Sequence, residues 1–315
     1  MSRLKDRYNI LCLSGGGFRG LYSASLLRQI EQGYGVTDIA GRFDLVIGTS
    51  TGALIAAGLA MGHSAKRLEQ AFLEHGPAIF AKLGWLSRLN RRLRFRPQYR
   101  TGPLSAAIEA VLGKAKAEAQ LDQLDANLAI VAVSQINWQL RVLSARPFAE
   151  ASSRITLADA ILASTAAPTY FKAHKIAGVD HLIDGGLVAN SPALVGAALL
   201  SKRRFVPLDR MFILHVGTAS PPVQNSFKTG RKLAYEHYQD LVLTMLHSQD
   251  ALAGDLCEAV FPQRYLKLDP PAELGVNDEL RAMDNAEPEV AGKLQFLAEK
   301  TWLEASRSTL LRSFF

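Results

Sequence analysis

Two successive units at the start of the chain, each a strand followed by a glycine-containing turn and a helix, constrain the fold most strongly. Tyr8 to Ser14 is a short apolar strand, followed by the glycine cluster Gly15 to Gly20 and by helical apolar spacing from Leu21 to Gln32. Phe43 to Ile47 is a second buried strand, and a GTSTG turn leads into the small and apolar segment Ala53 to Met61. Such units predict an α/β fold, with a central, mostly parallel sheet and helices on both faces.

The rest of the chain continues the α/β pattern without a repeat, a long linker or a break in composition. Further strands are expected at 127–134, 138–144, 180–183 and 210–216, and helices at 64–82, 103–112, 156–165, 228–252 and 287–312. We therefore expect a single domain over residues 1–315, with a motif-bearing core at about 8–220 and a helical covering at about 221–315. Because 48% of the residues are hydrophobic and 21% are charged, a disordered chain is excluded.

Charge and cysteine content bear on partners and compartment. The 36 Lys and Arg residues exceed the 29 Asp and Glu residues, and the net charge of +7 favours an anionic partner, such as a lipid surface or a phosphorylated ligand. Two cysteines, Cys12 and Cys257, cannot form a disulfide framework, and no Cys/His spacing indicates zinc. The apolar run at the start is too short for a secretory signal, so a cytoplasmic setting is expected.

The segment Gly48-Thr49-Ser50-Thr51-Gly52 places a serine between a strand and a helix. A sharp turn there would expose the Ser50 hydroxyl, and glycines on both sides avoid clashes that a Cβ would cause. The positive end of the following helix favours the negative charge of an acyl-transfer intermediate. A small polar turn would explain the five residues taken alone, but their place in the chain predicts a nucleophile.

The segment Ser14-Gly15-Gly16-Gly17-Phe18-Arg19-Gly20 offers backbone amides to an oxyanion or to a phosphate. Gly15, Gly17 and Gly20 match the GxGxxG pattern of dinucleotide sites, which keeps a nucleotide-binding sensor open as an alternative function. That pattern also requires an acidic residue at the end of the second strand, whereas Asp44 lies at its beginning. No Lys-Ser/Thr pair closes the segment as a P-loop.

A base for Ser50 is expected at Asp184, in Asp184-Gly185-Gly186 after an apolar strand. Taken alone, an Asp-Gly pair is usually a hairpin turn. An aspartate at the carboxyl end of a strand in the same parallel sheet would emerge at the edge where Ser50 lies. His215 completes the chain order of an α/β-hydrolase triad, but it falls inside a strand, and only 49 residues precede Ser50. We therefore favour a Ser50–Asp184 dyad and keep His215 as the alternative base.

Four motifs together, SGGGFRG, GTSTG, ASTAAPTYF (Ala163 to Phe171) and DGG, resemble the patatin-like phospholipase family in their order and spacing. The resemblance implies a single α/β domain that hydrolyses acyl esters of membrane phospholipids without metal or cofactor. It implies that Ser50 is the nucleophile, Asp184 the base, and Gly15, Gly16, Gly17 and Arg19 the oxyanion loop. Arg19 would brace this loop or contact a phosphate headgroup. The small residues of ASTAAPTYF have a plainer explanation, close packing against the Ser50 helix.

The helix after the glycine loop differs from that of many family members and indicates a subgroup of the family. Many family members continue with a GxxHxGVL-like helix, where this chain has Leu21-Tyr22-Ser23-Ala24-Ser25-Leu26-Leu27. That variant is similar to bacterial patatin-like effectors of anti-phage signalling (CBASS), which a cyclic dinucleotide switches on. The resemblance implies a cyclic dinucleotide as activator and peripheral action at the inner membrane surface; a constitutive esterase or lipase is the simpler alternative.

An arginine cluster precedes the helix expected at 103–112. Its members are Arg88, Arg91, Arg92, Arg94, Arg96 and Arg100, and guanidinium groups of this density can contact anionic headgroups or a nucleotide by bidentate hydrogen bonds. A solvated basic face is the plainer explanation. Aromatic residues interleave only as Phe95 and Tyr99, so a nucleic acid polymer is the least favoured partner. Homo-oligomerisation stays open.

Overall fold

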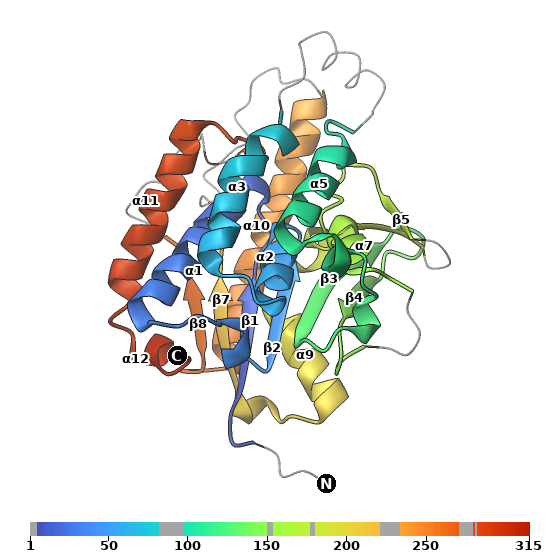
Figure 1. The fold of residues 1–315 in the computed structure, drawn as a ribbon. Helices are drawn as coiled ribbons and strands as arrows, with labels where there is room; N and C mark the ends of the chain where they lie inside the picture. Colours follow the sequence, from blue (N-terminus) through green and yellow to red (C-terminus); the bar gives the residue numbers. More distant parts are fainter. Residues whose placement is uncertain are drawn as a thin grey trace.

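The computed structural model describes residues 5–81, 97–149, 154–176, 180–220, 234–270, 280 and 282–315. They form a single α/β domain around an eight-stranded sheet, in the order β5-β6-β3-β2-β1-β7-β8 with β4 also paired to β3 (Figure 1). The strands are β1 (Tyr8–Leu13), β2 (Leu45–Thr49), β3 (Leu128–Ser134), β4 (Leu140–Ser144), β5 (His174–Ile176), β6 (Asp180–Asp184), β7 (Met211–Val216) and β8 (Tyr265–Leu268). Pairs among β3, β2, β1, β7 and β8 are parallel, whereas β4, β5 and β6 pair antiparallel. The expected mostly parallel α/β sheet is confirmed.

Helices cover both faces of the sheet, as expected (Figure 1). They are α1 (Gly20–Tyr34), α2 (Thr51–Ala60), α3 (Ala65–Ile79), α5 (Thr101–Leu112), α6 (Lys114–Ala117), α7 (Leu157–Ser164), α8 (Gly186–Ala189), α9 (Ala193–Arg204), α10 (Ala234–Val260), α11 (Pro288–Ala305) and α12 (Thr309–Arg312). Local sequence features determine where several of these helices begin or end. Gly35, with φ of 64°, ends α1, and Thr156 and Asp159 form a capping box at the start of α7.

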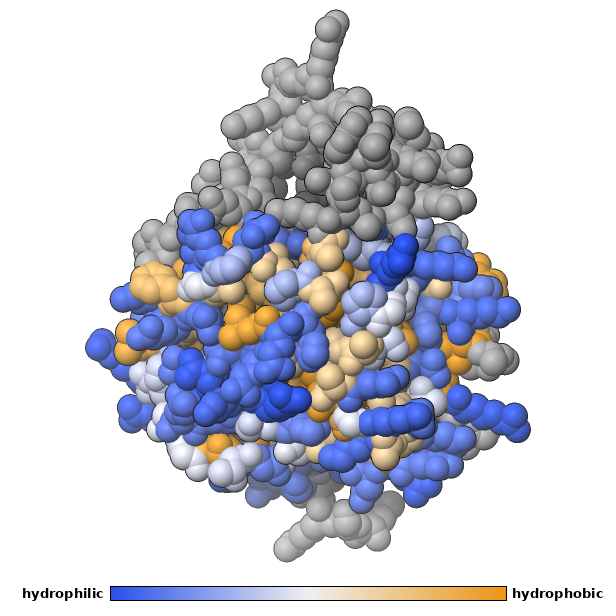
Figure 2. All heavy atoms as spheres, turned by 45° about the horizontal axis from the view of Figure 1, so that its top comes forward, coloured by the Kyte–Doolittle hydropathy of each residue, from blue (hydrophilic) through white to orange (hydrophobic). Residues whose placement is uncertain are grey.

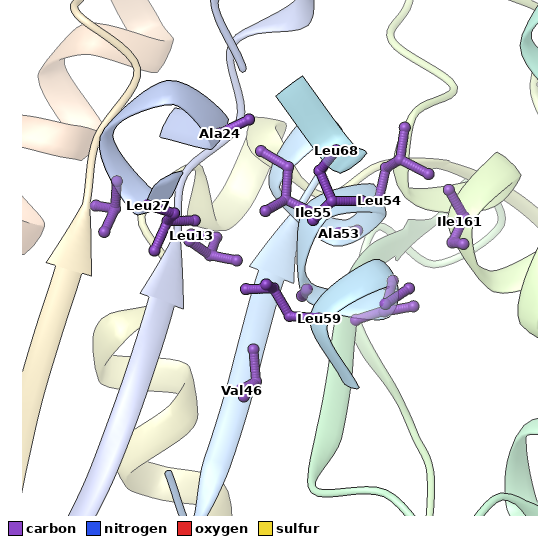
Figure 3. Packing of buried hydrophobic residues seen from close by; sticks show 14 of the residues in the cluster. Leu13, Ala24, Leu27, Val46, Ala53, Leu54, Ile55, Leu59, Leu68 and Ile161 are labelled. Atoms are coloured by element: carbon purple, nitrogen blue, oxygen red, sulfur yellow. The ribbon is translucent and has the colours of Figure 1, made fainter. Parts of the chain in front are cut away.

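Side chains alternate between the two faces of the sheet along each strand, and each face packs into its own hydrophobic core. Leu11 and Leu13 of β1 face the layer of α1, α2, α3, α5, α7 and α11, whereas Ile10 and Cys12 face α9 and the end of α10. Figure 3 shows part of the first core, in which Leu13 of β1 lies near Leu27 of α1, and Val46 of β2 lies below Leu59 of α2. Because both faces are covered, β1 and β2 are almost wholly buried, and their carboxyl ends present the loops that follow them.

Several elements differ from the sequence-based expectation. The segment expected to be a helical covering contains β8, which pairs parallel with β7 and extends the sheet. With only four residues and a lysine in the middle, β8 lacks a strand pattern of useful length. Neither β5 nor α9 was predicted, and the helix expected at 287–312 is divided into α11 and α12, where Ser308 caps the second helix.

Candidate active site

Ser50 occupies a strained turn between β2 and α2. Its backbone has φ of 54° and ψ of −125°, a region that non-glycine residues rarely adopt. The flanking glycines are required by close contacts, because a Cβ on Gly52 would overlap the carbonyl oxygen of Leu13, and one on Gly48 would overlap that of Gly52. The strained backbone and the glycines two positions away on either side give Ser50 the geometry of a nucleophile elbow.

Replacing Gly52 with alanine tests this packing. We expect Gly52→Ala to lower the free energy of unfolding by about 2–4 kcal/mol, because the new methyl group meets backbone of β1 that cannot move aside cheaply. Gly102→Ala is the matched control, since a Cβ there meets nothing within 4 Å. Urea unfolding monitored by circular dichroism measures both; equal stability of the two variants would contradict the close contact at Gly52.

The Ser50 hydroxyl donates a hydrogen bond of 2.6 Å to Oδ2 of Asp184. The other carboxylate oxygen, Oδ1, accepts a hydrogen bond of 2.7 Å from the amide of Gly186. Asp184 is only 5% exposed, and burial raises its pKa to about 6, although the hydrogen bonds from Ser50 and Gly186 oppose this shift. The carboxylate is therefore poised to take up a proton near neutral pH.

The strands bring Ser50 and Asp184 together by a route that differs from the expected one. Residues Ala129–Val133 of β3 pair with β4 along one edge, so β2 and β6 must share the opposite edge of β3. There Thr49 is paired with Val131 and Asp184 with the next residue, Ala132. The carboxyl ends of β2 and β6 thus meet head to head. Asp184 reaches Ser50 from an antiparallel strand, not from a parallel one as the sequence reasoning assumed.

Ser164, the last residue of α7, links the backbone of Ser50 to β3 through hydrogen bonds. Its hydroxyl accepts a hydrogen bond of 2.8 Å from the Ser50 amide and donates one to the carbonyl oxygen of Val131. The side chain is fully buried. Sequence analysis explained the small residues of ASTAAPTYF by close packing alone and missed this role. A serine within a run of small residues at the end of a helix was the available signal.

The glycine loop lies directly beside Ser50. A Cβ on Gly15 would come within 3.0 Å of the Ser50 Cβ, and the Gly15 amide is bonded to the carbonyl oxygen of Asn190. Among the described residues, the amides of Gly16 and Gly17 have no hydrogen-bond acceptor, and both residues line the same pocket as Ser50. Two such amides in the pocket that Ser50 lines suit a developing oxyanion.

Arg19 does not reach the surface. Its side chain is 3% exposed, and Nη1 donates a hydrogen bond of 3.3 Å to the carbonyl oxygen of Leu280. Burial lowers the pKa of its guanidinium to about 10, with Asp269 opposing the shift. Of the two roles expected for Arg19, this geometry favours bracing the glycine loop over contact with a phosphate headgroup.

His215 is buried beneath the glycine loop and does not contact Ser50. Its Nε2 lies 2.6 Å from the hydroxyl of Ser14, and its Nδ1 lies 2.7 Å from the hydroxyl of Tyr265. Burial lowers the pKa of the imidazole to about 4, so the ring is neutral at physiological pH. Both ring nitrogens are engaged away from Ser50, and this geometry disfavours His215 as its base.

An apolar pocket opens in front of the dyad and encloses about 1150 Å³, part of it open to solvent. Ser50, Asp184, Gly16 and Gly17 contribute its polar end. The remaining lining is mostly hydrophobic and includes Leu54, Ile55, Phe72, Ile79, Phe80, Leu104, Val111, Tyr170, Phe171, Leu246 and Met283. Such a pocket suits a hydrocarbon chain whose ester group reaches the polar end.

The remaining expectations concern the arginine cluster, a metal ion and a membrane span. Arg88, Arg91, Arg92, Arg94 and Arg96 lie outside the described residues, and Arg100 is exposed at the start of α5. In the described part of the chain, no three His, Cys, Asp or Glu side chains gather as a metal would require. None of the described helices combines the length and the apolar character needed to span a bilayer.

Comparison with known proteins agrees with this geometry. The profile of the family described as "Patatin-like phospholipase" matches residues 11–196. A "cGAMP-activated phospholipase" of Vibrio cholerae is 36% identical over 61% of this chain and 58% of its own length. Proteins of the same description from Escherichia coli and Pseudomonas aeruginosa are 34% and 36% identical, over 68% and 88% of this chain and 63% and 82% of theirs.

The profile covers more than half of the chain, including the glycine loop, Ser50 and Asp184, although the chain spans less than two thirds of the Vibrio cholerae and Escherichia coli relatives. The chain belongs to the patatin-like phospholipase family.

Proposed function

We propose that this protein hydrolyses acyl esters of membrane phospholipids by a two-residue mechanism. The observation that carries the proposal is the 2.6 Å hydrogen bond from Ser50 to a buried carboxylate at the polar end of an apolar pocket. Ser50 attacks the ester carbonyl while Asp184 takes its proton. The Gly16 and Gly17 amides stabilise the oxyanion, and loss of one such donor typically costs about 3–4 kcal/mol of barrier.

The second half of the reaction regenerates the enzyme. Collapse of the tetrahedral intermediate expels the lysophospholipid alkoxide, which takes the proton from Asp184. The acyl group is then esterified to Ser50. Asp184 accepts a proton from water, the resulting hydroxide attacks the acyl ester, and the fatty acid leaves as Ser50 recovers its proton. The same carboxyl group thus acts as base and then as acid in each half.

A cyclic dinucleotide is the proposed activator. The support is the similarity to three proteins described as "cGAMP-activated phospholipase". The test is to incubate the purified protein with phosphatidylglycerol-containing vesicles, with and without cyclic GMP-AMP, and to measure fatty acid and lysophospholipid by mass spectrometry. We expect both products in equal amounts and stimulation by the nucleotide. Release without stimulation would favour a constitutive lipase, and no release under either condition would contradict the proposal.

A nucleotide-binding sensor without hydrolytic activity has less support. The glycine loop faces the Ser50 hydroxyl and an apolar pocket, and a phosphate placed there would meet the buried Asp184. That arrangement suits a neutral ester group better than a permanently charged one.

The pKa of Asp184 predicts how the rate depends on pH. The mechanism needs the ionised carboxylate, so kcat/KM for a soluble neutral ester should be constant well above the pKa of about 6 and fall as pH drops through it. Below the pKa the expected loss is about tenfold per pH unit. Initial rates across the range between about pH 5 and 9 measure the profile. A rate that stays constant down to about pH 5, as an aspartate with its ordinary pKa would give, would contradict the effect of burial.

A further inference from the structure

The hairpin between β3 and β4 carries two of the three most exposed large apolar side chains among the described residues. Ile136 is 74% and Trp138 is 66% exposed, and only Phe205, at 82%, is more exposed. Hairpin turns are usually built from glycine and small polar residues. Here the tip, defined as Gln135–Gln139, places Ile136 and Trp138 in water, where their apolar surface gains nothing from folding.

The hairpin tip is held rigidly. The Ser134 hydroxyl accepts hydrogen bonds from the amides of Ile136 and Asn137, and the Ser134 carbonyl oxygen accepts one of 3.0 Å from the Trp138 amide. The Asn137 side chain accepts a hydrogen bond of 3.1 Å from the Gln139 amide. Trp138 has φ of 58°, a conformation that is unfavourable for a bulky residue. A fixed tip loses little conformational entropy when it binds another surface.

The tip projects from the edge of the sheet where Ser50 lies. β2 and β3 are parallel, and Thr49, which precedes Ser50, is paired with Val131. β3 continues for three further residues to Ser134, about 10 Å at the rise of a strand, before the tip begins. β6 supports this extension, since the Gln135 amide is bonded to the carbonyl oxygen of His181. The tip therefore lies beyond the level of Ser50 along β3, on the side of the molecule that carries β4 and β5 (Figure 1).

Positive charge flanks the tip on both faces of the sheet. Arg141 is paired with Ala132 and therefore shares its face of the sheet. Lys175 is paired with His181, which is bonded to Gln135, so Lys175 shares the face of Gln135. Side chains alternate between faces along a strand, and Ala132 and Gln135 are three residues apart, so the two cations lie on opposite faces. Both side chains are exposed, and within the described part of the chain neither forms an ion pair. The tip itself contains no acidic residue.

We propose that Ile136 and Trp138 insert into the interface of a bilayer that contains anionic phospholipid, while Arg141 and Lys175 contact its headgroups. Tryptophan favours this interface because its ring is apolar and its N–H remains hydrated. Two side chains are too small a patch for a specific protein interface, which buries about 800 Å² on each partner, but they suffice to anchor a protein that other contacts assist. The inference rests on the proposed phospholipase function, which supplies the reason for a lipid surface at this edge.

Among the described residues, no other exposed apolar group combines these features. On the face seen in Figure 2, hydrophobic residues lie in separate groups among hydrophilic ones. Phe205 follows α9 and precedes β7, so it lies near the amino end of the strands, opposite the edge that carries Ser50. It therefore provides a matched control: an exposed aromatic side chain that a membrane-bound enzyme would direct away from the lipid.

The experiment measures vesicle binding without turnover. In a Ser50→Ala background, Ile136→Ser/Trp138→Ser is compared with Phe205→Ser by co-sedimentation with vesicles of phosphatidylcholine and phosphatidylglycerol, with and without cyclic GMP-AMP. The tip variant should bind about tenfold more weakly, because apolar burial is lost, and Phe205→Ser should bind like the parent. Arg141→Glu/Lys175→Glu should weaken binding only when phosphatidylglycerol is present.

Several outcomes would overturn the inference. These are unchanged binding by the tip variant, an equal loss in Phe205→Ser, absence of parent binding under both conditions, or a tip variant whose own oligomeric state changes in sedimentation velocity, which would indicate a protein contact. With Ser50 restored, the tip variant should hydrolyse a soluble ester at the parent rate. If the proposed hydrolysis itself fails, no ester is cleaved by either protein, and the binding comparison still reports on the tip.

Discussion

Replacing Ser50 with alanine should abolish ester hydrolysis and leave the protein folded. The Ser50 hydroxyl is the only side-chain donor to Oδ2 of Asp184 among the described residues, and no other hydroxyl contacts that carboxylate there. Removing a nucleophile from a concerted site typically lowers kcat by about 10⁴- to 10⁶-fold. Alanine and serine bear similar strain at φ of 54°, so the melting temperature should change little.

Ser64→Ala is the matched control for this result. Ser64 caps α3 by accepting a hydrogen bond from the Arg67 amide, and it does not line the pocket. We expect this variant to lose about 1 kcal/mol of stability and to keep full activity. Hydrolysis of a soluble chromogenic ester and thermal unfolding measure both variants. Activity of Ser50→Ala within a few fold of the parent would show that another group is the nucleophile.

Replacing Asp184 with asparagine should remove activity and increase stability at neutral pH. Asparagine cannot accept the Ser50 proton, so we expect kcat to fall by about 10³- to 10⁴-fold or more. The pKa of Asp184 is raised from 3.8 to about 6 by burial, which means that the fold disfavours the ionised form. By linkage, the ionised carboxylate costs the folded state up to about 3 kcal/mol at neutral pH, a cost that asparagine does not carry.

The sign of this effect fixes its pH window. The protonated form of Asp184 favours folding, so its contribution is complete below the unfolded pKa of 3.8 and is lost as pH rises through about 6. The difference in unfolding free energy between Asp184→Asn and the parent should therefore be near zero at acid pH and reach its full value above about pH 7. Urea titrations at several pH values measure it. If Asp184→Asn were less stable than the parent above this pH, the claim that the buried, ionised Asp184 carboxylate destabilises the fold would be contradicted.

The sequence predicted the parts of the site that depend on local chemistry. The GTSTG turn could be predicted locally, because only glycine fits the close contacts at Gly48 and Gly52. The SGGG loop could be predicted for the same reason, and in the described part of the chain its Gly16 and Gly17 amides have no acceptor. The direction of β6 carries no such signal. A short apolar strand reads the same in parallel and antiparallel sheets, so Asp184 was assigned to the right neighbourhood through the wrong topology.

Long-range contacts account for what the sequence did not reveal. Ser164 supports Ser50 across 114 positions of the chain, and its role depends on where α7 packs against β3. Burial favours the bracing role for Arg19 over a headgroup contact, and no local pattern in the sequence predicts how deeply an arginine is buried. β8 pairs with the edge of the sheet that β7 provides, and a strand of only four residues has too short a pattern to predict that pairing.

Labelling with a fluorophosphonate is the most direct test of the central claim, that Ser50 is a nucleophile activated by Asp184. Peptide mapping by mass spectrometry should find one adduct per chain, on the peptide that contains GTSTG. In the parent, the rate of adduct formation should fall as the pH is lowered through about 6. In Asp184→Asn, the rate should be lower by orders of magnitude. An adduct on another serine, or labelling of Ser50 at the parent rate in Asp184→Asn, would contradict the account.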